Sequence, residues 1–197
     1  MTDKSELTFE RIKEINPKYI FFPHWSWIIP KDIYENFECI VFHMTDLPFG
    51  RGGSPLQNLI VRGIYDTKIS AIKVEKGLDT GPIYAKVPID ISEGSAEEIF
   101  KRVSDMVFEY LIPKIVEQEP IPKEQTGEPV VFSRRRPEES ELPEGLTDRQ
   151  TYDYIRMLDG EGYPKAFKRT DKGRLVYSNA RYIDGKLLYD EEFIEEI

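Results

Sequence analysis

The first part of the chain alternates between helix-like and strand-like patterns of apolar residues. Apolar residues between 7 and 15 recur at about helical spacing until Pro17, where the proline ends the pattern. The apolar runs 18–22 and 38–42 have the length and composition of buried strands, and residues 30–36 between them predict a short helix. A strand, a helix and a second strand in this order predict a right-handed parallel crossover.

Three further elements are expected between residues 54 and 91. Ser54 and Pro55 predict the N-cap and first position of a helix that Gly63 closes, because proline needs no backbone donor in the first turn. Residues 67–74 and 84–91 alternate between apolar and polar positions, as half-buried strands do. We expect these two strands to form a hairpin-like pair.

A longer helix is expected to cover the sheet. Ser95 and Glu98 have the spacing of a capping box. One apolar helical face follows before Pro113 interrupts the pattern. This face consists of Ile99, Val103, Met106, Val107, Tyr110 and Leu111. Residues 117–145 are rich in Pro, Glu and Gly and predict a linker that contains the short strand 129–133.

The C-terminal part predicts a small module of its own. Residues 147–158 predict a helix, and Tyr152 lies off its expected inward face. That face is expected to consist of Tyr154, Ile155 and Leu158. Two strands are predicted at 174–177 and 186–189. The whole chain is therefore expected to adopt an α/β fold with a mostly parallel sheet and a small α+β C-terminal appendage.

Composition excludes several classes of function. The net charge of -9 and the pI near 4.9 disfavour a general nucleic-acid or anionic-membrane binder, because phosphate contacts need a basic surface. Cys39 is the only cysteine and there are two histidines, so neither a disulfide nor a metal site is expected. No apolar run approaches the roughly 18 residues of a membrane span. We expect a cytoplasmic protein without a metal.

Two motifs place chemistry near the ends of predicted strands. His43 follows the strand 38–42 at its C-terminal end, where open α/β sheets form their ligand crevices. The histidine begins the pattern H-x-[ST]-x-L-P-x-x-R-G, and 36 residues later Asp79 lies in the sequence GLDTG of residues 77–81. A histidine and a carboxylate can together stabilise an oxyanion and collect a proton, so this pair suits group transfer to an amine.

These motifs resemble those of the 10-formyltetrahydrofolate-dependent formyltransferases over roughly residues 17–132. The resemblance implies a Rossmann-like fold and formyl transfer from 10-formyltetrahydrofolate, as co-substrate, to a primary amine. It also implies an Asn, His and Asp triad, in which His43 and Asp79 match the second and third members. Val41 occupies the place of the asparagine and cannot donate a hydrogen bond. Three residues are considered as replacements, with His24 preferred: His24, Thr45 and Asn58.

The same resemblance assigns binding residues. Those expected at the folate are Trp25, Leu47, Pro48, Arg51, Gly52, Gly77, Leu78 and Gly81. Those expected at the acceptor are Arg134, Arg135, Arg136 and Tyr163. Simpler explanations stay open: Arg51 fits equally well as an anchor of its own turn, Trp25 as packing, and the arginine run as a solvated linker.

The tail guides the choice of acceptor. Residues 152–167 resemble a segment of nucleotide-sugar N-formyltransferases, and the acidic end of the chain is a poor surface for tRNA. We therefore expect a small-molecule amine acceptor, a nucleotide-linked amino sugar. Methionyl-tRNA formyltransferase-like activity is the alternative, and a catalytically inactive folate-binding or structural remnant is an alternative of another class. The expected domains are a partial catalytic domain (1–132), a linker (133–146) and a C-terminal module (147–197).

The resemblance also predicts an unusual N-terminus. Members of this family have a strand, a helix and a strand before the segment that resembles residues 8–22, and these elements are not found here. We expect an N-terminally truncated sheet whose strand 18–22 is an exposed edge. Such an edge favours pairing between copies of the chain, so a homo-oligomer is expected.

Overall fold

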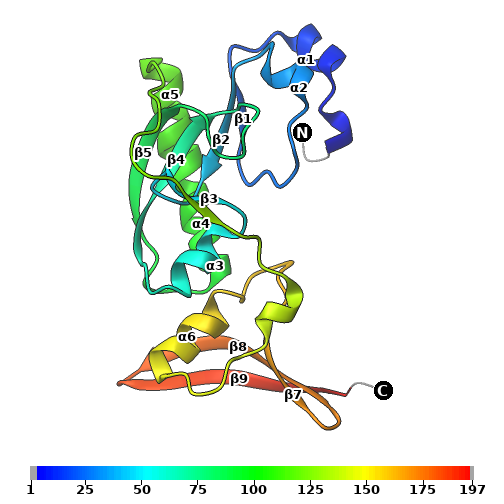
Figure 1. Cartoon of the computed structure of the whole chain (residues 1–197), viewed down its shortest axis with the longest axis vertical. Helices are drawn as coiled ribbons and strands as arrows, with labels where there is room; N and C mark the ends of the chain where they lie inside the picture. The colour runs from blue at the N-terminus through cyan, green and yellow to red at the C-terminus, as the bar shows by residue number, and fades with distance from the viewer. Residues whose placement is uncertain (1–3, 196–197) are drawn as a thin grey trace. The chain divides into compact units, whose positions relative to one another are not determined.

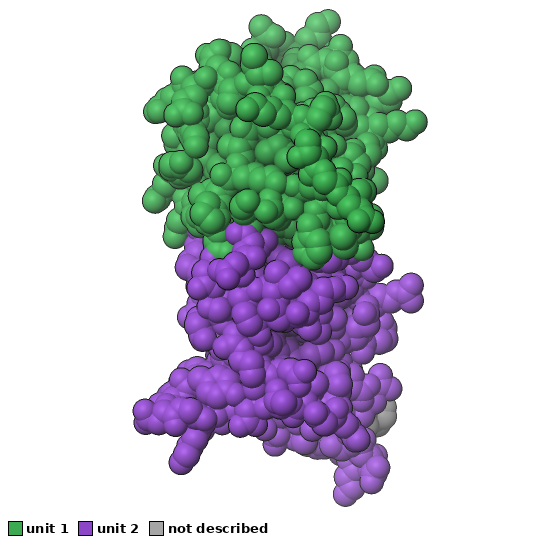
Figure 2. Space-filling model, turned by 60° about the vertical axis from the view of Figure 1, so that its left-hand side comes forward, with its two compact units in different colours: residues 1–52, 68–89, 104–131 green, residues 53–67, 90–103, 132–197 purple. Residues whose placement is uncertain are grey.

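The computed structural model describes residues 4–195 and forms two compact units (Figures 1 and 2). The first unit contains the described residues up to 52, together with 68–89 and 104–131. The second contains 53–67, 90–103 and the described residues from 132 onward. The domain boundaries expected from the sequence stay a prediction.

The first unit is built on a four-stranded sheet with the order β1-β2-β4-β5. The strands are β1 (Ile20–Phe22), β2 (Cys39–His43), β4 (Asp66–Lys73) and β5 (Ile83–Asp90). β1 and β2 run parallel, as the crossover through α2 (Lys31–Tyr34) predicts, whereas β2 and β4 run antiparallel. The α/β fold class is confirmed, and its parallel character rests on the β1 and β2 pair. β1 lies at one end of the strand order, and association of copies through it stays a prediction.

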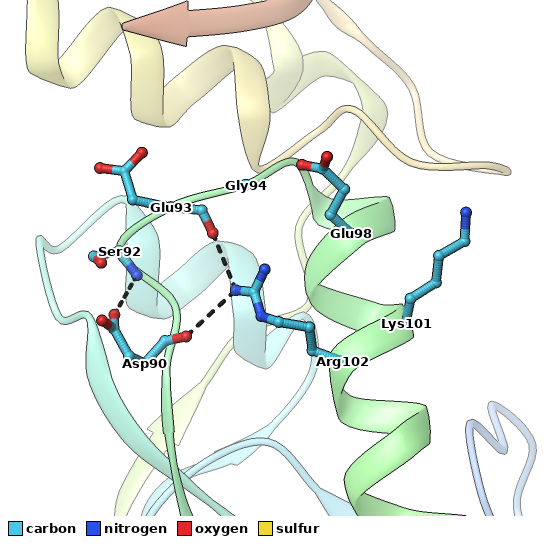
Figure 3. A pocket seen from close by; sticks show the side chains of 7 residues that line it. All are labelled: Asp90, Ser92, Glu93, Gly94, Glu98, Lys101 and Arg102. Carbon is cyan, nitrogen blue, oxygen red and sulfur yellow. Dashed lines mark hydrogen bonds between the residues drawn. The ribbon is translucent and has the colours of Figure 1, made fainter.

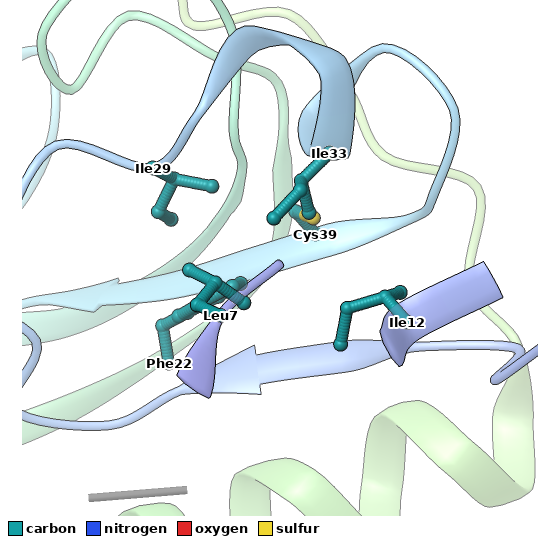
Figure 4. Packing of buried hydrophobic residues seen from close by; sticks show 6 residues of the cluster. All are labelled: Leu7, Ile12, Phe22, Ile29, Ile33 and Cys39. Atoms are coloured by element: carbon teal, nitrogen blue, oxygen red, sulfur yellow. The ribbon is translucent and has the colours of Figure 1, made fainter. Parts of the chain in front are cut away.

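Alternate residues of β2 face two different apolar layers. Cys39 belongs to a cluster on the side of α1 (Phe9–Ile15) and α2, shown in Figure 4. Its buried members are Leu7, Ile12, Phe22, Ile29, Ile33 and Cys39. The next residue, Ile40, packs with Ala71, Tyr84 and Ile115 of α5 (Ile112–Gln118). Because side chains alternate along a strand, helices cover both faces of the sheet.

The predicted break at Pro113 is wrong. The capping box is present, since Ser95 N donates to Glu98 Oε2 at 2.8 Å and Glu98 N donates to Ser95 Oγ at 3.2 Å. The helix α4 (Ala96–Met106) then widens into one π-helical turn and continues as α5. A wider turn accommodates a proline that has no N–H and would clash with a carbonyl of the preceding turn. It also rotates the helical face, so Tyr110 is exposed although the pattern placed it inward.

The second unit combines α6 (Asp148–Arg156) with a three-stranded sheet of order β7-β8-β9. Its antiparallel strands are β7 (Ala166–Thr170), β8 (Gly173–Ile183) and β9 (Lys186–Glu195). β7 was not predicted, and β8 and β9 are longer than predicted. Tyr152 is buried, which corrects its expected outward position, because its ring packs against Tyr182 of β8 at a centroid distance of 5.3 Å. The other elements are η1 (Lys4–Glu6), β3 (Phe49–Gly52), α3 (Pro55–Ile60), η2 (Val107–Leu111), β6 (Val130–Phe132) and η3 (Pro137–Ser140).

Cys39 is 1% exposed in the first cluster, and burial raises the pKa of its thiol to about 12. We expect the native protein at pH 8 to resist labelling by 5,5′-dithiobis(2-nitrobenzoate), and the protein unfolded in guanidinium to react fully. In the unfolded chain the thiol has a pKa of about 8.5. As pH rises from about 8.5 towards 12, the unfolded chain loses the thiol proton while the folded chain keeps it, so the free energy of unfolding falls. Rapid labelling of the native protein, followed by absorbance, would contradict this burial.

Candidate functional site

His43 and Asp79 lie together in the first unit, although 36 residues separate them in the chain. His43 ends β2 and is 8% exposed. Its Nδ1 lies 3.5 Å from Asp79 Oδ2, and its Nε2 lies 2.7 Å from the carbonyl oxygen of Gly50. Both ring nitrogens therefore face acceptors, an arrangement that suits an imidazole ring carrying two N–H donors.

Asp79 has an unusual backbone conformation for a residue with a side chain. Its φ is 53°, in the left-handed region, which aspartate tolerates better than most residues. Its Oδ2 accepts a hydrogen bond from the backbone N–H of Gly52 at 2.8 Å, and it is the same oxygen that faces His43. The carboxylate is thus fixed between the end of β3 and the imidazole ring.

The strand β3, which carries Gly50, is anchored by buried polar groups. Thr45 is fully buried, and its Oγ1 donates to the Gly50 carbonyl oxygen at 3.4 Å. The Ser70 hydroxyl donates to the Thr45 carbonyl oxygen at 2.7 Å. The Gly50 carbonyl oxygen therefore marks a point that the donors of both His43 and Thr45 reach.

The Leu47–Pro48 loop is held from the side of the sheet. Lys86 donates to the Leu47 carbonyl oxygen and to the carboxylate of Asp46, which also pairs with Lys68 at 2.9 Å. Burial alone would raise the pKa of Asp46, but the two ammonium groups hold that pKa below its usual value. Leu47 and Pro48 are both predicted folate residues. The side chain of Leu47 is buried, so it also packs in the core.

Arg51 is anchored by a residue that the sequence did not indicate. Its Nε and Nη2 donate to Gln125 Oε1 at 3.1 and 2.7 Å. Gln125 Nε2 in turn donates to the carbonyl oxygens of Asp79 and Gly81, both at 2.9 Å. Gln125 lies in the segment interpreted as a linker, where neither periodicity nor a motif singles it out.

The glycines of the Asp79 loop are required by close contacts. A Cβ on Gly81 would lie 1.9 Å from the carbonyl oxygen of Lys73, and one on Gly77 would lie 2.2 Å from Thr80 Oγ1. Leu78 between them is 71% exposed. The predicted folate residues of this loop thus comprise two constrained glycines and one solvent-facing apolar side chain.

The preferred replacement for the missing asparagine has a partner of its own. His24 Nε2 lies 2.6 Å from the Ser104 hydroxyl of α4. Trp25 packs edge-on against Phe22 and Trp27, with centroid distances of 5.4 and 4.9 Å, which supports the packing explanation. A donor role for His24 stays a prediction.

Asn58, the third proposed replacement, makes its side-chain hydrogen bonds within the second unit. Its Nδ2 donates to the carbonyl oxygens of Gly53, Ser54 and Ser133 at 2.9 to 3.1 Å. Its Oδ1 accepts from Arg62 Nη1 at 2.7 Å. These contacts engage both the amide nitrogen and the amide oxygen, so Asn58 fastens α3 to the segment after β6.

Comparison with known proteins adds two family matches. A family model described as "Formyl transferase" matches residues 3–115, which is more than half of the chain. The chain belongs to the formyl transferase family. A second model, described as "Methionyl-tRNA formyltransferase, C-terminal domain", matches residues 137–192. The resemblance found in the sequence is thereby confirmed.

Individual relatives of this formyl transferase chain differ in how much they share with it. The solved methionyl-tRNA formyltransferase from Clostridium thermocellum is 59% identical, with a TM-score of 0.95, over 100% of this chain and 86% of that one. The methionyl-tRNA formyltransferase of Nitratiruptor sp. is 35% identical over 59% of this chain and 38% of its own length. A 4-N formyltransferase from Francisella tularensis is 16% identical, with a TM-score of 0.67, over 96% of this chain and 77% of that one, and shows the same fold. The chain spans about half or less of the length of the curated relatives that it matches.

The arginine run of the formyl transferase chain divides into two kinds of residue. Arg135 donates to the Tyr154 hydroxyl at 3.0 Å and to the Glu139 carbonyl oxygen, so it holds the second unit together. Arg134 and Arg136 have exposed side chains. The structure thus leaves two of the three arginines facing solvent.

Tyr163, the fourth residue expected at the acceptor, stacks on Phe100 at a centroid distance of 5.7 Å, and burial raises the pKa of its phenol.

A charged pocket in the second unit contains none of the predicted site residues (Figure 3). It is lined by Asp90, Ser92, Glu93, Gly94, Glu98, Lys101 and Arg102. Arg102 Nη2 donates to the carbonyl oxygens of Asp90 and Glu93 at 3.3 and 3.0 Å. Its lining contains both acidic and basic side chains, so it offers no single charge to a ligand.

Residues 4–195 contain neither a candidate metal site nor a candidate membrane-spanning helix. In this part of the chain, no group of three or more His, Cys, Asp or Glu residues is placed to hold a metal ion. No helix within the same range is both long and apolar enough to cross a membrane.

Proposed function

We propose that this chain transfers a formyl group from 10-formyltetrahydrofolate to the amine of methionyl-tRNA. The observation that carries the proposal is the buried His43 imidazole, held between the Gly50 carbonyl oxygen and the Asp79 carboxylate. Family membership supports formyl transfer and the folate donor. The 59% identity to a protein named methionyl-tRNA formyltransferase supports the acceptor.

The reaction needs a donor that stabilises an oxyanion and a group that takes up a proton. The acceptor nitrogen attacks the formyl carbon, an oxyanion forms, and the bond between this carbon and N10 of the folate breaks. The acceptor nitrogen loses a proton and N10 gains one. His43 donates from Nε2 to the developing oxyanion in place of Gly50, and Asp79 orients the ring and takes up the proton directly or through water.

Val41 removes one donor from the family pattern. It lies two residues before His43 on the same face of β2 and packs against the apolar cluster of α1 and α2. Losing one oxyanion donor typically costs about 10²–10³ in rate unless another group replaces it. Because the Thr45 hydroxyl and His43 reach the same oxygen, the geometry supports Thr45 over His24 as that group.

The loops around His43 and Asp79 are the proposed folate site. Leu47 and Pro48 precede β3, Arg51 and Gly52 end it, and Gly77, Leu78 and Gly81 come from the Asp79 loop. Arg51 and Gly52 are each tied to the Asp79 loop, through Gln125 and through the Asp79 carboxylate. A rigid pair of loops suits a donor that must be held in one orientation for transfer.

Charge on the C-terminal sheet bears on the acceptor. The β7 and β8 region carries five cationic side chains, Lys165, Lys168, Arg169, Lys172 and Arg174, with Asp171 as its one acid within residues 165–174. Such a local basic group suits phosphates of a tRNA despite the net charge of the chain. The acidic residues of β9 would repel tRNA phosphates, and this argues for the smaller acceptor of the second candidate, a nucleotide-linked amino sugar. They are Asp190, Glu191, Glu192 and Glu195.

The decisive experiment measures tetrahydrofolate release from 10-formyltetrahydrofolate with methionyl-tRNA and, separately, with 4-amino-sugar nucleotides. We expect release with methionyl-tRNA, and loss of that release in His43→Ala. Release with the sugar nucleotide alone would replace the first candidate by the second. Binding of a folate analogue without release in either assay would identify an inactive folate-binding protein.

A double variant tests the basic group within the same assay. In Lys168→Glu/Lys172→Glu, kcat/KM for methionyl-tRNA should fall at least about 10-fold, and its salt dependence should weaken, because phosphate contacts are lost. Binding of a folate analogue should not change. Lys13→Glu, on the exposed side of α1, is the matched control and should leave both unchanged. An equal loss in both proteins would contradict a role for the β7 and β8 cations.

A further inference from the structure

We infer that Gln125 is a positioning residue that holds the Asp79 carboxylate against His43, a role that rests on the proposed function. Its amide makes four contacts within the first unit, two from Arg51 and two to the Asp79 loop. None of these contacts involves the reacting groups themselves. Gln125 would therefore act on the reaction only through Asp79.

The orientation of the Gln125 amide is fixed by its neighbours. Arg51 can only donate, so it must face the amide oxygen, and the carbonyl oxygens of Asp79 and Gly81 can only accept, so they must face the amide nitrogen. A flipped amide would lose all four contacts. A carboxylate at this position would keep Arg51 but could donate to neither carbonyl oxygen.

The strand-like segment that carries Gln125 is fastened on both sides. Two residues earlier, Lys123 exchanges backbone hydrogen bonds with Ile83 at 2.7 and 2.9 Å. Further on, Val130 N donates to the Pro48 carbonyl oxygen at 3.2 Å. The segment that carries Gln125 is therefore held by backbone hydrogen bonds on both sides of this residue, which allows the side chain to locate the Asp79 loop.

The contacts of Gln125 close a ring around the site. Arg51 contacts Gln125, Gln125 contacts the backbone of Asp79, and the Asp79 carboxylate accepts from the N–H of Gly52, which is the next residue after Arg51. The loop needs such support, because Asp79 has a φ of 53° and the loop residue Leu78 is exposed. Removing the Gln125 donors opens the ring on the side of Asp79.

The test uses the full chain and Gln125→Glu, with Glu124→Gln, an exposed neighbour, as the matched control. We expect kcat to fall about 10- to 100-fold in Gln125→Glu, because misplacing a catalytic group by about 1 Å can cost 10²-fold. KM for the acceptor should change less than threefold. In an Asp79→Asn background the same substitution should have almost no further effect on kcat, because residues that act as a unit are not additive.

A second readout does not depend on activity. Exchange of the Gly52 amide proton, followed by NMR, reports its bond to Asp79, and we expect it to accelerate at least fivefold in Gln125→Glu but not in Glu124→Gln. A wild-type chain without formyl transfer would refute the proposed function, and the Gly52 exchange would still decide the structural role. Unchanged exchange, or a kcat loss that persists in full beside Asp79→Asn, would overturn the inference.

Discussion

Replacing Asp79 by asparagine should lower kcat for formyl transfer about 10³-fold, within the range that one acid or base group contributes. Asparagine has nearly the same shape, so an oxygen can still accept from the Gly52 N–H, and the loop should keep its conformation. What is lost is the negative charge 3.5 Å from His43 Nδ1, and with it the group that collects the proton. Steady-state release of tetrahydrofolate measures the effect.

Asp105→Asn is the matched control, because Asp105 lies exposed on α4 and loses the same charge. Its kcat should stay within twofold of the wild type. Folate-analogue binding by Asp79→Asn should also be close to normal, which would separate a loss of chemistry from a loss of binding. A kcat for Asp79→Asn within threefold of the wild type would remove Asp79 from the mechanism.

Replacing Gly81 by alanine should destabilise the protein by about 3 kcal/mol, the upper part of the usual range for overpacking. The new Cβ would lie 1.9 Å from the Lys73 carbonyl oxygen and 2.9 Å from its carbon, so backbone rather than a flexible side chain must move. The neighbouring bond from Lys73 N to the Pro82 carbonyl oxygen, at 2.9 Å, joins β4 to the chain before β5 and would be disturbed. Urea denaturation gives the free energy of unfolding.

A glycine in open surroundings separates collision from backbone strain. Gly145 has a φ of 74° and nothing within 4 Å of an added Cβ, so Gly145→Ala should cost only about 1 kcal/mol through its left-handed backbone. Gly81→Ala should also lower kcat, because Gln125 binds the Gly81 and Asp79 carbonyl oxygens together. Equal unfolding free energies for the two variants would contradict this prediction, because they would show that the backbone between β4 and β5 moves at little cost.

The candidate site shows how far motif reasoning reaches. The spacing of the two motifs pointed to His43 and Asp79, the structure brings their side chains to 3.5 Å, and their catalytic role stays a prediction. The contacts of Asn58 and Arg135 differ from the roles that the sequence suggested, because they depend on a carbonyl oxygen and a tyrosine far along the chain. Motif reasoning missed Gln125 altogether, because a single glutamine in a segment rich in Pro, Glu and Gly carries no local signal.

Local sequence determined where most helices and strands begin. Ser95 makes the predicted capping bond to its first turn, Thr8 and Thr147 also cap the helices that they precede, and the apolar runs around β1 and β2 became a parallel pair. These features depend on residues within a few positions of one another. A single chain is therefore enough to predict them.

Tertiary structure decided the features that depend on contacts between segments far apart in the chain. Pro113 continues a helix because a π turn keeps Val107, Leu111 and Ile115 buried, and Tyr152 is buried because β8 covers it. The sheet became mixed because β4 pairs antiparallel with β2, which no local pattern specifies. Burial and hydrogen-bond satisfaction are properties of the assembled fold, and they fixed the geometry of the site around the two residues that the sequence had selected.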